Sequence, residues 1–320
     1  MPQLDRKQQL AFSRSSSFRR LQGKMGSATY RLNTIFVGLE HIAAGKGQLP
    51  GGFAVTWKAP ESSEVAKQVA DQARLFACLA ATALAYDVVD QYIEDISSEP
   101  WITLSESTKQ IATKAVTRPS NQGGAYGLHE RALAIAKELE VDEPLHIALL
   151  EFLAKWRNST VHGSIRDAKL SDASQKLLQN EVAISEAYSH LNIKLALDNF
   201  KSKKTPVPKE ITSLIASAQN LLRKLDEAAI KEAFPTTDAV ERYCLCIFRG
   251  LFVTESGVLT GRLNEYFTRP SDWRRKFLLK TIAPNGVTAT GTPTSPAVGD
   301  DFFDRLAAED PKQLLKTLTE

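Results

Sequence analysis

The sequence predicts an all-α fold, a helical bundle with additional helices at both ends. Apolar residues recur at spacings of three and four through most of the 320 residues. Prolines and small polar residues stand where helices should begin and end. Only one short segment, 53–58, alternates as a strand does, and a single strand lacks the partner that a sheet requires.

The N-terminal segment, residues 1–60, is expected to hold a basic arm followed by a short helix over 28–44. Residues 1–31 contain seven lysines and arginines and a single acid, Asp5. Three interpretations of this arm stay open: a solvated or packed tail, a contact with RNA phosphates, and a targeting segment rich in arginine and serine. We favour the tail.

The central segment, residues 61–200, is expected to form the helical bundle. Its longest helix is predicted over 64–96, with Ser62 or Ser63 as the cap and Pro100 just after its end. Further helices are predicted over 105–117, 128–140, 144–157, 172–200, 208–233, 236–258 and 271–282. The junction that runs from Lys201 to Pro208 separates the bundle from a C-terminal helical region, residues 201–283.

Two segments of different character follow this region. Residues 284–299 are rich in glycine, proline and threonine and are expected to be a flexible linker. Residues 300–320 form an amphipathic tail, whose apolar side chains can dock on a partner or on the same chain. These side chains are Phe303, Leu306, Leu314, Leu315 and Leu318.

The bulk composition bounds the class of protein. A net charge of +3 is too small to indicate nucleic-acid binding by itself. The three cysteines, Cys78, Cys244 and Cys246, have no framework spacing and suit a reducing compartment. The sequence has neither a charge-free apolar stretch of about 18 residues nor a secretory signal. We therefore expect a cytoplasmic protein without a membrane partner.

The stretch 154–163 carries the chemistry that is easiest to interpret. It places Arg157, Asn158 and His162 directly after an apolar helical run. Arginine is a permanent cation that suits phosphate, and histidine transfers protons near neutral pH. On a straight helix Arg157 and His162 lie about 140° apart. Either the helix ends or distorts here, or the long arginine side chain reaches round to a phosphate beside the helix.

One such motif supplies only one histidine. Metal-free cleavage of RNA benefits from two proton-transfer groups, one for the 2′-hydroxyl and one for the leaving 5′-oxygen. A second copy of the chain would supply the second group in a symmetric site. The sequence therefore predicts a homodimer.

This stretch resembles the signature of the HEPN-domain ribonucleases. Members of that family are small helical bundles with an arginine, commonly followed by asparagine, and a histidine after four to six further residues. Arg157, Asn158 and His162 match this pattern with four residues between arginine and histidine. The match spans about ten residues of the chain. It covers neither the N-terminal arm nor the chain after residue 200.

The resemblance implies an HEPN-like bundle that cleaves RNA without a metal or other cofactor, as toxins and anti-phage effectors do. His162 would be the general base, or the general acid in the partner subunit. Arg157 would stabilise the phosphorane, and Asn158 would orient the histidine or the phosphate. The products would be a 2′,3′-cyclic phosphate and a 5′-hydroxyl. A regulatory protein partner is also expected, because uncontrolled cleavage would harm the cell.

Other candidate residues have simpler interpretations. The acidic row Asp87, Asp90, Glu94 and Asp95 can bind a metal or relay protons, but a solvated acidic face is commoner. The remaining histidines, His41, His129, His146 and His190, lack ligand spacing and are expected to be packed or exposed. The basic and aromatic segment 262–280 suits single-stranded RNA, although a packed hairpin is favoured.

Two alternatives to an enzyme remain. The first is a helical adaptor in which Arg157 and His162 cap helices or pack between them. The second is an RNA-binding protein without cleavage, which would use the 1–31 arm and the 262–280 segment.

Overall fold

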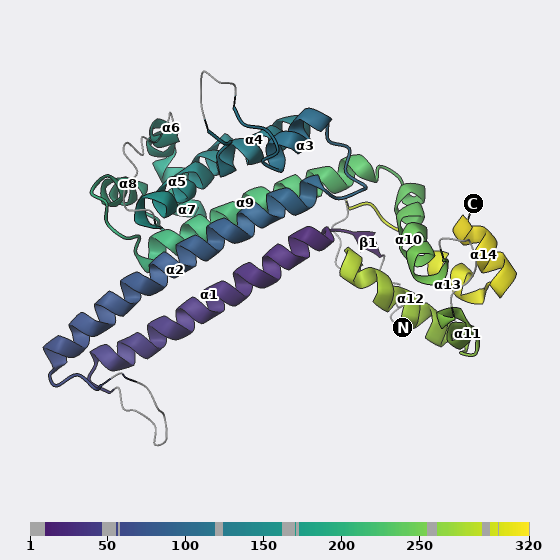
Figure 1. The fold of residues 1–320 in the computed structure, drawn as a ribbon, viewed down its shortest axis with the longest axis horizontal. Helices are drawn as coiled ribbons and strands as arrows, with labels where there is room; N and C mark the ends of the chain where they lie inside the picture. Colours follow the sequence, from purple (N-terminus) through teal and green to yellow (C-terminus); the bar gives the residue numbers. More distant parts are fainter. Residues whose placement is uncertain are drawn as a thin grey trace, which may run out of the picture. The chain divides into compact units, whose positions relative to one another are not determined.

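The computed structural model confirms the all-α fold (Figure 1). It describes residues 10–46, 56, 58–118, 124–161, 170, 173–254, 261–289, 295–299 and 301–319. Within these ranges it contains fourteen α-helices, one short 3₁₀ helix and one two-stranded sheet. The strand-like segment 53–58 lies outside the described residues except for residues 56 and 58.

The elements follow one another in a simple order. Strand β1 (Ala11–Phe12) precedes the two longest helices, α1 (Ser16–Ala43) and α2 (Ser63–Ser97). The next helices are α3 (Glu106–Ala112), α4 (Leu128–Glu138), α5 (Pro144–Val161), α6 (Ala173–Gln179), α7 (Glu181–Ala187), α8 (Ile193–Lys201) and α9 (Pro208–Ala233). The last elements are α10 (Thr237–Phe252), α11 (Arg262–Phe267), α12 (Ser271–Ile282), β2 (Val287–Thr288), α13 (Phe302–Ala308) and α14 (Pro311–Thr319).

The chain divides into two compact units. The bundle unit consists of residues 20–98 and 104–224, and the terminal unit of residues 1–19, 99–103 and 225–320. The division passes through α1 and α9, so each of these helices contributes to both units. The sequence boundary that we expected at residue 201 lies within the bundle unit.

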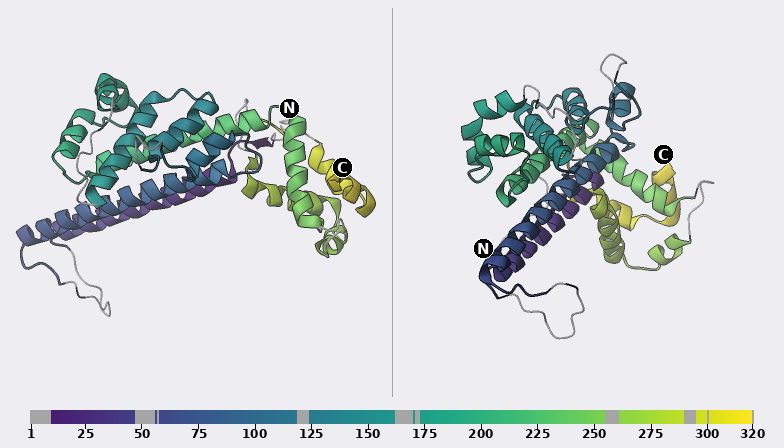
Figure 2. Two further views of the ribbon diagram at one scale, coloured as in Figure 1. Left: turned by 45° about the horizontal axis from the view of Figure 1, so that its top comes forward. Right: turned by 60° about the vertical axis from the view of Figure 1, so that its left-hand side comes forward.

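In the bundle unit, α1 and α2 run antiparallel along each other (Figures 1 and 2). Ion pairs join them at two levels, Arg20 to Asp95 at 3.0 Å and Arg74 to Glu40 at 2.6 Å. The predicted helix over 28–44 is much longer in the structure and begins at Ser16. The buried face of α1 explains its length, because its apolar residues recur at spacings of four, three, four and seven, which keeps them on one side of the helix. These are Leu21, Met25, Ala28, Leu32 and Leu39.

Helix α2 is the central helix of the bundle unit. It begins at the N-cap Ser62, whose hydroxyl accepts a hydrogen bond from the amide of Val65. Its buried residues pack against α3, α4 and α5, and Tyr92 donates to the carbonyl of Leu222 on α9. By length and composition alone, α2 is also long and apolar enough to cross a membrane.

The segment predicted as one helix over 172–200 contains three helices, α6, α7 and α8. The chain turns at Asn180 and again at Ser189 and His190. Both Ser189 and His190 have positive φ angles, 51° and 66°, which a continuous α-helix does not allow. The apolar periodicity correctly predicted helical structure in each of the three segments, but it did not reveal the breaks between them.

The terminal unit is built around aromatic side chains. Strands β1 and β2 pair antiparallel, with Phe12 opposite Val287. Phe12 is fully buried, and residues 10–31 are therefore a strand and a packed helix rather than a solvated arm. Residues 1–9 lie outside the described residues.

The expected linker and tail also belong to this unit. Val287 and Val298 are buried, so the parts of 284–299 that the structure describes pack on the core instead of forming a free linker. The tail docks on its own chain. Four of its five predicted apolar residues, Phe303, Leu306, Leu314 and Leu318, are buried in the core of the terminal unit, as is Phe302, whereas Leu315 is only partly buried.

Candidate functional site

Helix α5 carries the candidate motif and is firmly anchored. Pro144 stands at its first position, where a missing amide hydrogen is tolerated. Trp156 is buried, stacks on Phe152, and donates from Nε1 to the carbonyl of Lys204 at 2.9 Å. The residues that follow Trp156 are therefore held at a fixed place on the bundle.

Arg157 lies where α5 passes α2. Its guanidinium carbon is 4.7 Å from the centre of the Tyr86 ring, and Nη1 donates to Oδ1 of Asn158 at 3.1 Å. Nη2 is 3.8 Å from the carboxylate of Asp87. The Arg157 side chain remains 20% exposed.

The helix continues through the motif as far as Val161. The hydroxyls of Ser159 and Thr160 both donate to the carbonyl of Trp156, at 2.8 and 2.9 Å. The helix is therefore continuous from Pro144 to Val161, and the two routes considered for Arg157 both stay open, because the end of the stretch lies outside the described residues. His162 lies outside the described residues. Arg157 and Asn158 are thus brought together, and Asn158 contacts the arginine.

The acidic row on α2 is divided between a solvated residue, Asp87, and carboxylates that pair with cations. Asp90 and Glu94 both pair with Arg131 of α4 and with Lys114. Arg131 is only 1% exposed and also donates from Nε to the carbonyl of Ala112 at 2.7 Å. These ion pairs join α2, α3 and α4 directly behind the contact between Tyr86 and Arg157.

Sequence reasoning did not single out Tyr86 or Arg131. Arg131 has a visible signal, because it takes a buried position in the apolar period of Leu128, Ala132 and Ile135. Tyr86 has none, since its partner lies on another helix. Burial raises the pKa of Tyr86, Asp90 raises it further, and Arg157 opposes both. The phenol is therefore neutral at physiological pH.

Two of the other histidines are paired with carboxylates. His146 Nδ1 lies 2.6 Å from Glu143, and His129 Nε2 lies 3.8 Å from the buried Glu151. Burial lowers the pKa of both histidines, although the neighbouring carboxylates act in the opposite direction. His41 is exposed. These findings agree with packed or exposed side chains.

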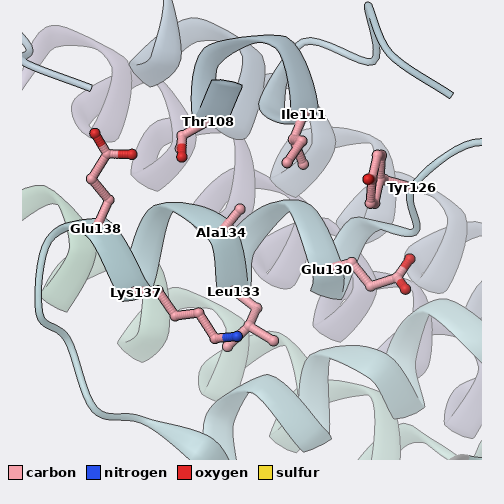
Figure 3. A pocket seen from close by; sticks show the side chains of 8 residues that line it. All are labelled: Thr108, Ile111, Tyr126, Glu130, Leu133, Ala134, Lys137 and Glu138. Carbon is pink, nitrogen blue, oxygen red and sulfur yellow. The ribbon is translucent and has the colours of Figure 1, made fainter. Parts of the chain in front are cut away.

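A groove of about 460 Å³ lies between α3 and α4 (Figure 3). Its floor is apolar, and Tyr126, Lys137, Glu130 and Glu138 stand around it. Glu130 is engaged by Arg118 and by the amide of Gly127, and Glu138 binds the N-cap Ser105. The lining of the groove includes none of the three motif residues.

The basic and aromatic segment 262–280 forms a packed helical hairpin. Tyr266 is buried, and Arg274 lies over its ring and donates to the carbonyl of Glu309. Arg275 pairs with Asp304 at 2.7 Å. The packed interpretation therefore describes most of this segment, although Trp273 is 36% exposed.

The candidate site thus joins a guanidinium, an amide and an aromatic ring at the surface of the bundle unit. A guanidinium held in this way can bind an oxyanion and stabilise charge that develops on it. Comparison with protein-family models, curated proteins and solved structures found no match for the chain.

Proposed function

We propose that this protein is a metal-independent endoribonuclease of the HEPN type. The observation that carries the proposal is the place of Arg157, which is anchored on α5, oriented by contacts from α2, and partly exposed. Arginine at a solvent-accessible edge beside a histidine-bearing segment suits a phosphodiester. An arginine sealed in the apolar interior would have contradicted this function.

The mechanism follows from the charges of the motif residues. His162 removes the proton from the 2′-hydroxyl, which attacks the neighbouring phosphorus. The bond to the 5′-oxygen breaks, and a second proton-transfer group protonates that oxygen. Arg157 stabilises the phosphorane, and its contact with Asn158 supports its orientation.

The second proton-transfer group is assigned to a partner subunit, which makes the enzyme a cytoplasmic homodimer. Large apolar side chains on α1 and α2 support self-association. Tyr30, Val37 and Phe76 are 75%, 61% and 72% exposed, and a second copy of the chain would bury their apolar surface. The biological setting that fits best is a toxin or a defence effector under the control of a regulatory protein.

The direct test is cleavage of labelled RNA by the purified protein in EDTA. We expect 2′,3′-cyclic phosphate and 5′-hydroxyl ends, and no cleavage of a 2′-O-methyl substrate. The variants Arg157→Ala and His162→Ala should each lose about 10²- to 10⁴-fold in rate. Asn158→Ala should lose less, because it acts through the arginine.

Matched controls exist for both essential residues. Arg242 is 70% exposed and pairs with Asp238 on its own helix α10, and His41 is exposed in the last turn of α1. Arg242→Ala and His41→Ala should cleave like the unchanged protein. Cleavage that persists in Arg157→Ala and His162→Ala, or that EDTA abolishes, would contradict the proposal.

The same experiment distinguishes the two non-enzymatic alternatives. An RNA-binding protein would shift RNA in a salt-dependent manner and leave it intact. Deleting residues 1–31 cannot test whether the arm binds RNA, because the deletion also removes the buried Phe12. The exposed Arg19 and Lys24 can instead be replaced by glutamate. An adaptor would neither bind nor cleave RNA.

A further inference from the structure

The aromatic ring of Tyr86 on α2 faces the guanidinium of Arg157 on α5. The 4.7 Å separation is well within the range of about 6 Å over which a cation attracts an aromatic face. Resting on the proposed function, we infer that Tyr86 is a positioning residue. Its ring sets the orientation in which Arg157 meets the phosphate of the RNA.

Two other contacts of Arg157, with Asn158 and Asp87, are less able to set this orientation. Asn158 is the next residue on the same helix, so its hydrogen bond does not tie the arginine to α2. Asp87 does lie on α2, but it is 64% exposed and 3.8 Å away. Ion pairs that are this exposed contribute little. The half-buried ring is the contact best suited to hold the guanidinium against a second helix.

The position of Tyr86 is itself fixed. Asp90, one turn further along α2, pairs with the buried Arg131 and with Lys114. Arg131 is bound in turn to the carbonyl of Ala112. This part of α2 therefore cannot rotate without breaking buried ion pairs, which are costly to leave unpartnered.

The contact of the guanidinium with the Tyr86 ring is compatible with phosphate binding. A ring covers the face of a guanidinium, whereas the N–H donors point outward in the guanidinium plane. The ring and a phosphate therefore use different parts of Arg157. The exposed carboxylate of Asp87 is a contact that an RNA phosphate can replace.

The test compares three substitutions. Tyr86→Leu removes the ring and should lower kcat about five- to thirtyfold with little change in KM, because Arg157 acts on the transition state. Tyr86→Phe retains the ring and should keep kcat within about twofold. Tyr126→Leu is the matched control, since Tyr126 forms another arginine–tyrosine contact, with Arg118, elsewhere in the bundle unit. It should cleave normally.

A second readout does not depend on activity. The side-chain Nε–H resonance of Arg157, assigned by its loss in Arg157→Lys, should move in Tyr86→Leu and stay in place in Tyr86→Phe. Thermal unfolding shows that each variant is folded. If the unchanged protein cleaves RNA but Tyr86→Leu keeps its kcat, the positioning role is overturned. If the protein does not cleave RNA, the proposed function fails, and the resonance still decides whether the ring orients Arg157.

Discussion

At the scale of single residues, equal spacing hides different roles on α2. Asp87, Asp90 and Glu94 recur at intervals of three and four, so the sequence presents them as one acidic row. In the structure Asp90 and Glu94 neutralise the buried Arg131, while Asp87 remains largely exposed beside Arg157. Only Asp87 is therefore placed to repel an incoming phosphate.

This position predicts the effect of Asp87→Asn. Removing one exposed negative charge beside Arg157 should lower KM for RNA about two- to threefold at low salt, with kcat unchanged. The effect should fade at high salt, because the charge is screened. Steady-state kinetics at two ionic strengths measures it. Asp71→Asn is the control on the same helix, and a higher KM in Asp87→Asn would mean that Arg157 needs this carboxylate.

At the scale of elements, local signals predicted helices where the chain carries a clear beginning and end. Helices α9 and α12 were predicted with the bounds that the structure shows, 208–233 and 271–282. Pro208 and the Pro270–Ser271 pair mark their first turns. Helix α1 was predicted too short, because Gly23, Gly26 and several serines lower helix propensity. The contact of α1 with α2 stabilises it, and a local window cannot include that contact.

The candidate site likewise contains residues that a local pattern reveals and one residue that it does not. Arg157 and Asn158 are neighbours in the sequence, so a short motif can reveal them. Tyr86 reaches Arg157 only because α2 and α5 pack against each other. No spacing rule connects residues on two helices whose packing is unknown. The sequence could therefore identify the charged group but not the ring that faces it.

The contacts of Glu143, just before α5, predict how the stability of the fold depends on pH. Burial raises the pKa of Glu143, but bonds from Lys224 of α9 and from His146 outweigh burial, and the net pKa is lowered. A carboxyl with a lowered folded pKa stabilises the fold above its unfolded pKa of 4.5. That stability is lost as the pH falls through the folded pKa. His146, whose pKa burial lowers, acts in the same direction.

Glu143→Gln should therefore reduce the free energy of unfolding by about 1–2 kcal/mol at pH 7. The difference from the unchanged protein should shrink as the pH falls below about 4.5, because the unfolded carboxyl is protonated first, and it should vanish below the lowered pKa of the native carboxyl. Urea denaturation at a series of pH values measures this. Glu61→Gln, at an exposed position before α2, should leave the free energy of unfolding unchanged at every pH. If the two proteins differed in free energy of unfolding by the same amount at all pH values, the lowered pKa of Glu143 would not contribute to stability.

At the scale of the whole molecule, one of the two units is assembled from distant parts of the chain. The terminal unit combines residues 1–19, 99–103 and 225–320. Its core brings Phe12 against Trp101, Phe234 and Tyr243, with ring centres 4.9 to 5.7 Å apart. Composition left open whether the arm is solvated or packed, and it suggested a flexible linker. In the structure Phe12, Val287 and Val298 are buried in one core with residues of α10, α12, α13 and α14.

Phe12→Ala should therefore destabilise the terminal unit and not the bundle unit. Deleting a fully buried phenylalanine costs about 3–5 kcal/mol. Hydrogen exchange should accelerate in α10, α12 and α14, while the amides of α5 stay protected. Val182→Ala, at a 71% exposed position on α7, is the control and should leave exchange unchanged. Loss of protection in α5 as well would show that the two units unfold together. If α5 stays protected, RNA cleavage should persist in Phe12→Ala, because Tyr86, Arg157 and Asn158 all belong to the bundle unit.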